Sequence, residues 1–133
     1  MIIRTAQQAA FEPGLRQKYL LRICAHLRSR NLPAVDELAE PELQRRAEIG
    51  IARARTHGLD AEWSVAAFVA LMFAISPAFD RQPEIAAVLR DDSIEPNSRV
   101  DALTSRVTRQ GWQNASKLSG GQIWAALPPV KRS

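Results

Sequence analysis

The sequence predicts an all-α protein: a compact bundle of about five helices around a central hydrophobic helix, with an irregular C-terminal tail. The central helix is expected at about residues 61–75, because the stretch WSVAAFVALMFAISPAF, residues 63–79, is apolar on nearly every side. A helix of this kind must be surrounded by other elements or by a partner. The other apolar residues recur at helical spacing, and no run shows the two-residue alternation of a strand. With 133 residues, the chain fits one domain.

Capping residues and prolines locate the first helices. The T-x-x-Q motif of residues 5–8 is a capping box and predicts a helix start near Ala6. Pro13-Gly14 interrupts or kinks this pattern, and a helix of about residues 15–29 should follow. That helix should end before Pro33, which disfavours helix in the residue that precedes it. Its apolar positions are Leu15, Tyr19, Leu20, Ile23, Cys24 and Leu27.

A second long helix is expected at about residues 41–57, after one short turn at residues 34–38. Pro41 suits its first turn. Gly58 is placed to end it after a last turn that contains basic residues, which complement the negative end of the helix dipole. Its apolar stripe is formed by Leu43, Ala47, Ile49, Ile51 and Ala54.

Three further helices follow in the sequence. Asp60 is expected to cap the central helix, which should end near Ile75 because Ser76-Pro77 follows. A short helix is predicted at residues 83–90. A last helix should run from about residue 97 to Gly111.

We therefore divide the chain into a helical domain, residues 1–111, and a C-terminal tail, residues 112–133, that is partly extended. The tail contains glycine and proline pairs and a basic end, but it also carries Trp112, Ile123 and Trp124. A tail without apolar residues would be a solvated end. This tail either folds back onto the domain or anchors another protein.

The distribution of charge leaves the class of partner open. The formal net charge is +4. Residues 1–35 carry six Lys or Arg side chains against Glu12 alone, the last residues are also basic, and the middle of the chain is net acidic. Such a pattern serves an acidic partner, solubility or self-association.

We expect a cytoplasmic protein without a membrane span. Cys24 is the one cysteine, so no disulfide can form within the chain. The first residues lack the apolar core and cleavage site of a signal peptide, and the unbroken apolar run of residues 65–75 is too short to cross a bilayer.

Catalytic, metal and cofactor sites are not expected. His26 and His57 lie on different predicted helices, and no second cysteine or His-x-x-x-His spacing supports a metal site. The acidic run of Asp91, Asp92 and Glu95 has no basic or nucleophilic partner near it in sequence. The phosphate-binding and nucleophile motifs of known enzyme classes are also missing from the sequence.

Two binding functions remain from the residues alone. A basic nucleic-acid-binding module is the weaker one, because the basic residues of the last predicted helix, Arg99, Arg106 and Arg109, are spread out. Protein binding is favoured, because tryptophan and arginine are enriched among interface anchors. The predicted protein-binding residues are Trp112, Ile123, Trp124, Arg106 and Arg109.

Several segments together resemble a known family. The start MIIRTAQQAA resembles the family's opening isoleucines, capping residue and Gln-rich first helix, and residues 94–103 resemble the start of its closing helix. The stronger match is an acidic helix that ends in a G-I-x-R-A unit, a turn, an apolar L-M-F helix and a turn of the form [G/S]-x-x-F-D-x-x-P. Its matching pieces are Gly50-Ile51-Ala52-Arg53-Ala54, His57-Gly58, Leu71-Met72-Phe73, Ser76-Pro77-Ala78-Phe79-Asp80 and Pro83. In the last turn we expect Phe79-Asp80 to dock against the core and to cap the next helix.

The family consists of small proteins encoded in bacterial type VI secretion effector clusters, beside PAAR or VgrG spike proteins and effector chaperones. The resemblance covers about residues 1–105, and none of its motifs is catalytic. It implies a co-chaperone or adaptor that binds an effector chaperone, a spike protein or an effector before delivery. A cytoplasmic immunity protein of the same cluster is the alternative. Self-association is left open.

Overall fold

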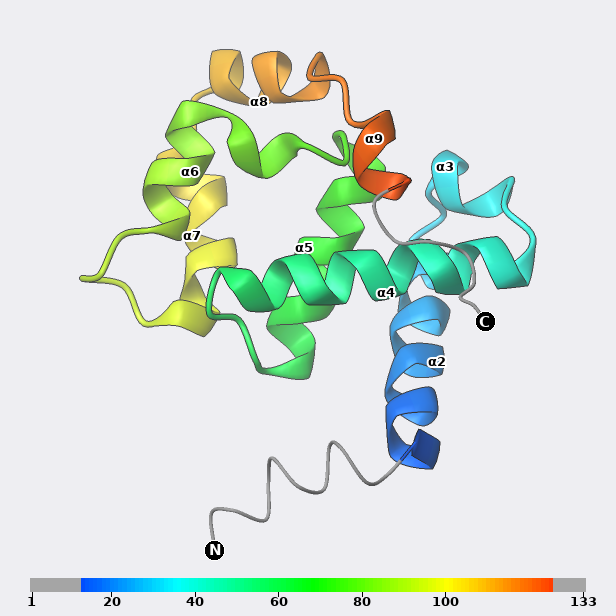
Figure 1. Ribbon diagram of the computed structural model, residues 1–133. Helices are drawn as coiled ribbons and strands as arrows, with labels where there is room; N and C mark the ends of the chain where they lie inside the picture. The colour runs from blue at the N-terminus through cyan, green and yellow to red at the C-terminus, as the bar shows by residue number, and fades with distance from the viewer. Residues whose placement is uncertain (1–12, 126–133) are drawn as a thin grey trace, which may run out of the picture.

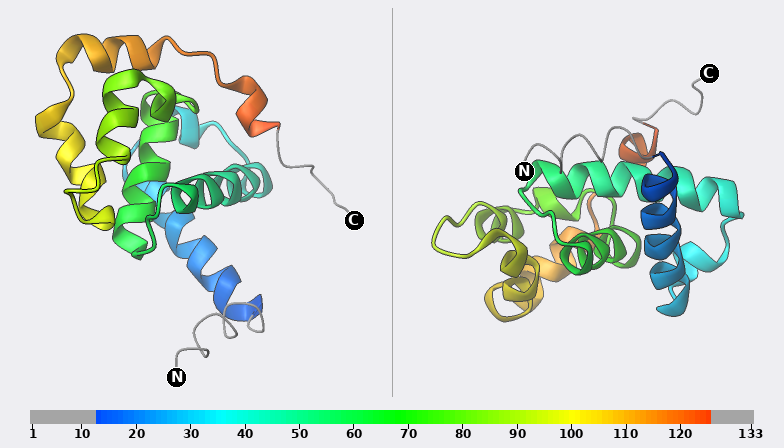
Figure 2. Two further views of the ribbon diagram at one scale, coloured as in Figure 1. Left: turned by 60° about the vertical axis from the view of Figure 1, so that its left-hand side comes forward. Right: turned by 90° about the horizontal axis from the view of Figure 1, so that it is seen from below.

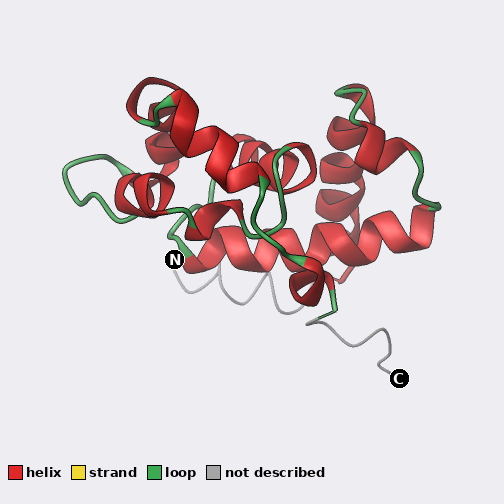
Figure 3. Cartoon of the chain, turned by 90° about the horizontal axis from the view of Figure 1, so that it is seen from above, coloured by secondary structure: helices red, strands yellow, loops and turns green. Residues whose placement is uncertain are grey.

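The computed structural model describes residues 13–125. These residues form eight α-helices and two 3₁₀-helices and no strand, so the predicted all-α fold is confirmed (Figure 3). The predicted helix start at residues 5–8 and the end of the predicted tail, residues 126–133, lie outside this range.

The first described helix, α2, spans Pro13–Ser29, and the single-turn helix α3 spans Pro33–Asp36. Pro13 begins α2, which suits a residue without an amide hydrogen. The second half of α2 packs into the core, whereas its N-terminal part extends away from the body of the molecule (Figures 1 and 2).

Helix α4 spans Glu40–Thr56 and crosses the front of the molecule in Figure 1. Pro41 lies in its first turn, as the sequence predicts. The chain then turns at Gly58, whose φ of 85° is accessible to glycine at little cost. The predicted stop at this glycine is confirmed.

Helix α5 spans Glu62–Ala74 and is the predicted central helix. The predicted cap by Asp60 is wrong: Ala61 takes the capping position, and no side chain caps the helix from there. The side chain of Asn97 instead accepts hydrogen bonds from the backbone N–H groups of Asp60 and Ala61, each at 3.0 Å. A residue distant in sequence thus fixes the backbone that leads into α5.

The apolar side chains of α5 are covered from several directions, because α2, α3, α4 and α7 all contact it. Its buried residues are Ser64, Val65, Ala66, Phe68, Val69, Ala70, Met72 and Phe73. Each large apolar side chain among them contributes about 1.5–3 kcal/mol on burial. Trp63, in the first turn, is the exception, with 55% of its surface exposed.

The C-terminal half of the chain consists of short helices. They are η1 (Phe79–Arg81), α6 (Pro83–Leu89), η2 (Pro96–Ser98), α7 (Arg99–Arg106), α8 (Arg109–Ser116) and α9 (Gly121–Trp124). Helix α6 packs on α7 and η1, and in Figure 1 α8 leads across the top to α9. Helix α9 returns to contact α4.

The predicted last helix, from residue 97 to Gly111, is wrong at its end. Helix α7 stops at Arg106, and Thr108 caps a new helix, α8, by accepting a hydrogen bond from the N–H of Gly111 at 3.0 Å. The hydroxyl and N–H of Thr108 also bond the carboxylate of Glu84 on α6. This contact, from far along the chain, stabilises the break between the two helices.

Helix α4 packs tightly against α5 at Gly50. A Cβ atom placed there would lie 3.0 Å from both γ-methyl carbons of Val69 and 3.3 Å from the sulfur of Met72. Gly50→Val should therefore lower the free energy of unfolding by about 1–3 kcal/mol through overpacking, measured by urea denaturation. The control Ala52→Val, at an exposed position of the same helix, should cost about 0.5 kcal/mol. Equal losses for the two variants would contradict the close packing.

Candidate functional site

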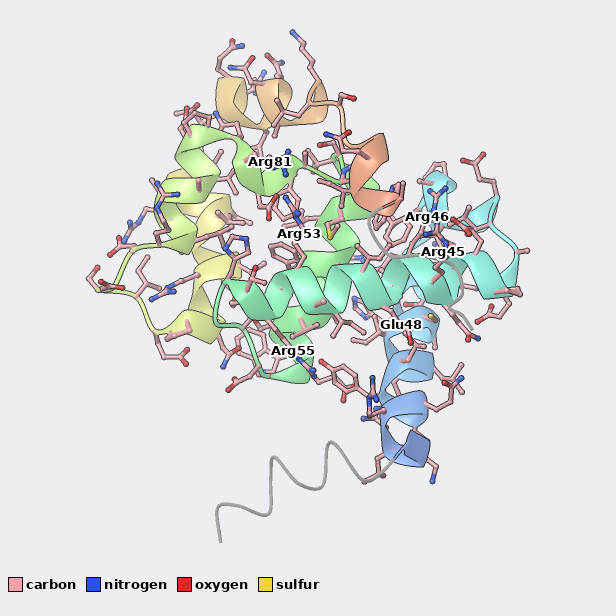
Figure 4. The ribbon with its side chains drawn as sticks, in the orientation of Figure 1. Arg45, Arg46, Glu48, Arg53, Arg55 and Arg81 are labelled. Atoms are coloured by element: carbon pink, nitrogen blue, oxygen red, sulfur yellow. The ribbon has the colours of Figure 1, made fainter. Side chains whose placement is uncertain are left out.

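One face of α4 carries three arginines, Arg45, Arg46 and Arg53. Arg53 follows Arg45 by eight residues and Arg46 by seven, which is about two full helical turns, so it lies on the same face as both. Arg81 of η1 lies next to this face, near Arg53, and we call the four residues the arginine face. Figure 4 shows them toward η1 and α9, with Arg55 on the opposite side of α4.

Glu42 holds two of the arginines in place. Its carboxylate accepts hydrogen bonds from Arg45 at 2.7 Å and from Arg46 at 2.6 Å. The hydrogen bonds from Arg45 and Arg46 lower the pKa of Glu42 to about 2. This end of the arginine face is therefore pre-ordered, with one carboxylate between two guanidinium groups.

Helix α9 packs onto the same face through Trp124. The indole stacks on the ring of Phe73, with 5.1 Å between ring centroids, and the guanidinium carbon of Arg46 lies 5.4 Å from the indole centroid. Arg45 donates a hydrogen bond to the carbonyl oxygen of Trp124. Stacking and cation–π contacts fix the end of the described chain against α4 and α5.

Asp80 links η1 to α4 from within the structure. Its side chain is only 4% exposed, and its carboxylate accepts hydrogen bonds from Arg53 at 2.8 Å and from the Nε2 of His57 at 2.9 Å. Burial by itself would raise the pKa of this carboxyl, but the hydrogen bonds from His57 and Arg53 outweigh burial and hold the pKa below its usual range. Asp80 is thus an ionised, buried anchor for Arg53 of α4 and for His57, the residue that follows this helix.

The turn that contains Asp80 was predicted to dock Phe79 on the core and to cap the next helix with Asp80. Phe79 is fully buried, and its ring lies 5.0 Å from that of Phe68, so the docking is confirmed. The predicted cap is wrong, because Gln82 caps α6 by accepting a hydrogen bond from the N–H of Ile85. The buried ion pair occupies Asp80 instead.

A groove of about 390 Å³ opens between α4, η1 and α9. Its lining residues are Ile49, Ala52, Arg53, Thr56, Arg81, Gln122 and Ile123. Apolar side chains from α4 and α9 form part of its wall, while Arg81 and Gln122 are exposed. Neither of these two side chains makes a hydrogen bond or ion pair with any residue of the range 13–125.

The groove is lined by polar and aliphatic groups. Its lining supplies a guanidinium pair, an amide, a hydroxyl and aliphatic carbons. Cys24 lies elsewhere, buried, and burial raises the pKa of its thiol to about 11, which makes it a poor nucleophile. In the part of the chain that the structure describes, no cluster of His, Cys, Asp or Glu could hold a metal ion.

The structure distributes the predicted protein-binding residues over three helices. Ile123 and Trp124 of α9 are 4% and 9% exposed and belong to the core, and Trp112 of α8 is half-buried against it. Arg106 lies 3.4 Å from Asp91 on an exposed surface, and Arg109 is exposed. Ile123 alone among these five lines the groove. Their role in binding a protein stays a prediction.

Sequence reasoning did not single out the arginine face. The spacing of Arg45, Arg46 and Arg53 on the helix predicted at residues 41–57 was a usable signal. The position of Arg81 was not accessible, because it depends on how η1 folds back on α4. Arg99, which was considered as a phosphate contact, is instead buried and donates hydrogen bonds to the carbonyl oxygens of Leu89 and Ile94.

Comparison with protein-family models, curated proteins and solved structures finds no match to this chain. Inference about function therefore depends on the residues of the chain and their geometry. Within residues 13–125, no helix combines the length and the hydropathy that a membrane crossing requires.

Asp80→Asn should lower the free energy of unfolding by about 3 kcal/mol near pH 7, because it removes the buried negative charge that the half-buried side chains of Arg53 and His57 face. The pKa of Asp80 is lower in the folded than in the unfolded state, so this stabilisation is complete above the unfolded pKa and is lost as the pH falls through the folded pKa. The difference between wild type and variant should therefore shrink below about pH 4 in urea denaturation.

The matched control is Asp92→Asn, because the Asp92 side chain is fully exposed and lies 3.8 Å from Arg99. We expect no measurable change in the free energy of unfolding, because solvent screens an exposed ion pair. A pH-independent loss at Asp80, or an equal loss for both variants, would contradict the role of Asp80 as an ionised anchor.

Proposed function

We propose that this chain is a non-enzymatic adaptor that binds another polypeptide through the groove between α4, η1 and α9. The observation that carries the proposal is the combination of an aliphatic wall with the guanidinium of Arg81, which no residue of the range 13–125 neutralises. Protein interfaces typically combine an apolar centre with a polar rim, and arginine is enriched among their anchors.

Pre-organisation supports the same function. Within the groove lining, Arg53 is held by Asp80, and Ile123 lies on α9 next to Trp124, which is stacked on Phe73. A surface whose side chains are already ordered loses less conformational entropy when a partner binds. The groove is small, which suits a short segment of a partner rather than a large flat interface.

The narrower role is that of a cytoplasmic co-chaperone in type VI effector loading, with an effector chaperone as partner, or a spike protein or effector. Its support is the sequence resemblance. Arg53 belongs to the G-I-x-R-A unit and Asp80 to the F-D-x-x-P turn, and these two residues form the ion pair beside the groove. The resembling motifs and the groove thus involve the same part of the fold.

The test is co-expression of the full chain with each chaperone, spike and effector protein encoded beside its gene, followed by size-exclusion chromatography with light scattering. We expect one of these proteins to co-elute with the chain at a fixed stoichiometry. Ala52→Glu, which places a charged and larger side chain at an exposed position of the groove, should weaken that complex by about tenfold or more.

Ala87→Glu is the matched control, because it makes the same change at an exposed helical position outside the groove lining. It should leave the complex unchanged. Elution of the chain alone beside every one of these proteins would contradict the adaptor function. A complex that Ala52→Glu and Ala87→Glu affect equally would contradict the groove as its docking site.

A further inference from the structure

Charge and shape of the groove restrict what can occupy it. Arg53 already bonds Asp80 at 2.8 Å, so its positive charge is largely compensated, whereas Arg81 next to it faces solvent without a described counter-charge. Figure 4 shows both arginines in the region between α4 and η1, and both belong to the groove lining. A ligand that enters beside them should therefore carry a negative group for Arg81.

The remaining lining defines the neighbouring groups of the ligand. Ile49 and Ala52 of α4 and Ile123 of α9 provide an aliphatic contact surface. Gln122 on the rim has an amide that can both donate to and accept from a peptide backbone. An aliphatic side chain, a peptide unit and a carboxylate can thus each find a matching group.

We propose that the groove recognises a short segment of the partner polypeptide in which an aspartate or glutamate lies next to an aliphatic residue, with Arg81 as the carboxylate-binding side chain. This inference rests on the adaptor function and specifies the chemistry of its partner. A bidentate pair between the guanidinium of Arg81 and the acidic side chain supplies orientation, and the aliphatic side chain supplies the apolar contact.

Nucleic acid fits the groove less well. Single strands are bound by aromatic side chains that stack on bases, and none of the seven residues that line the groove is aromatic. The one tryptophan nearby, Trp124, is stacked on Phe73 and covered by Arg46.

The test is selection from a random library of peptides with acetylated and amidated ends, so that every carboxylate comes from a side chain. The full-length protein should enrich peptides that contain Asp or Glu beside Leu, Ile or Val. In fluorescence titrations, Arg81→Glu should lower the affinity for the enriched peptides by about tenfold. Raising the salt concentration should lower the affinity of the wild-type protein for the same peptides. Circular dichroism and urea denaturation verify that Arg81→Glu is folded.

Arg30→Glu is the matched control, because Arg30 is exposed and lies outside the groove lining. This substitution changes the net charge by the same amount as Arg81→Glu. It should leave peptide affinity unchanged. Enrichment of no peptide, of peptides without acids, or of peptides that bind Arg81→Glu as tightly as wild type would overturn the inference. A labelled oligonucleotide that loses affinity on Arg81→Glu and is not displaced by the peptides would also overturn it. The adaptor function is tested separately by complex formation with full-length partners.

Discussion

Burial of α5 is the constraint on which the rest of the structure depends. Apart from its first turn, this helix is apolar on nearly every side, so no single neighbour can cover it. In response, α2, α3, α4 and α7 surround it, and the close contact at Gly50 lets α4 approach without an intervening side chain. The polar faces that remain on the covering helices are the surface of the protein. One of them carries Arg45, Arg46 and Arg53 of the arginine face, and its position follows from how α4 lies on α5.

The ion pair of Asp80 extends this arrangement into the C-terminal half. Phe79 packs in the core beside Phe68. Because Asp80 follows Phe79 in the chain, its carboxylate is buried as well, and there it accepts hydrogen bonds from Arg53 and His57. The [G/S]-x-x-F-D-x-x-P turn thus has a structural role in this chain, with an apolar anchor and a charged anchor in succession. As a consequence Arg81, the next residue, lies in the wall of the groove.

Local sequence signals predicted the helices well where they coincide with tertiary packing. The apolar run of α5, the proline at the start of α4 and the glycine after it define those elements without help from distant residues. Predictions failed where a residue distant in sequence determines the end of a helix. Asn97 accepts a hydrogen bond from the backbone just before α5, and Glu84 bonds Thr108 at the break before α8. The groove was out of reach for the same reason, because Arg53, Arg81 and Gln122 come from three segments that only the fold brings together.

The most direct test of the central claim is amide hydrogen exchange of the folded protein, followed residue by residue by NMR. If α5 is enclosed on all sides, its amides from Val65 to Met72 should exchange only through global unfolding, with a free energy equal to that from urea denaturation. The amides of α8, which lies at the edge of the bundle, should exchange through smaller openings. Exchange of the α5 amides as fast as those of α8 would contradict the claim that a covered central helix organises this fold.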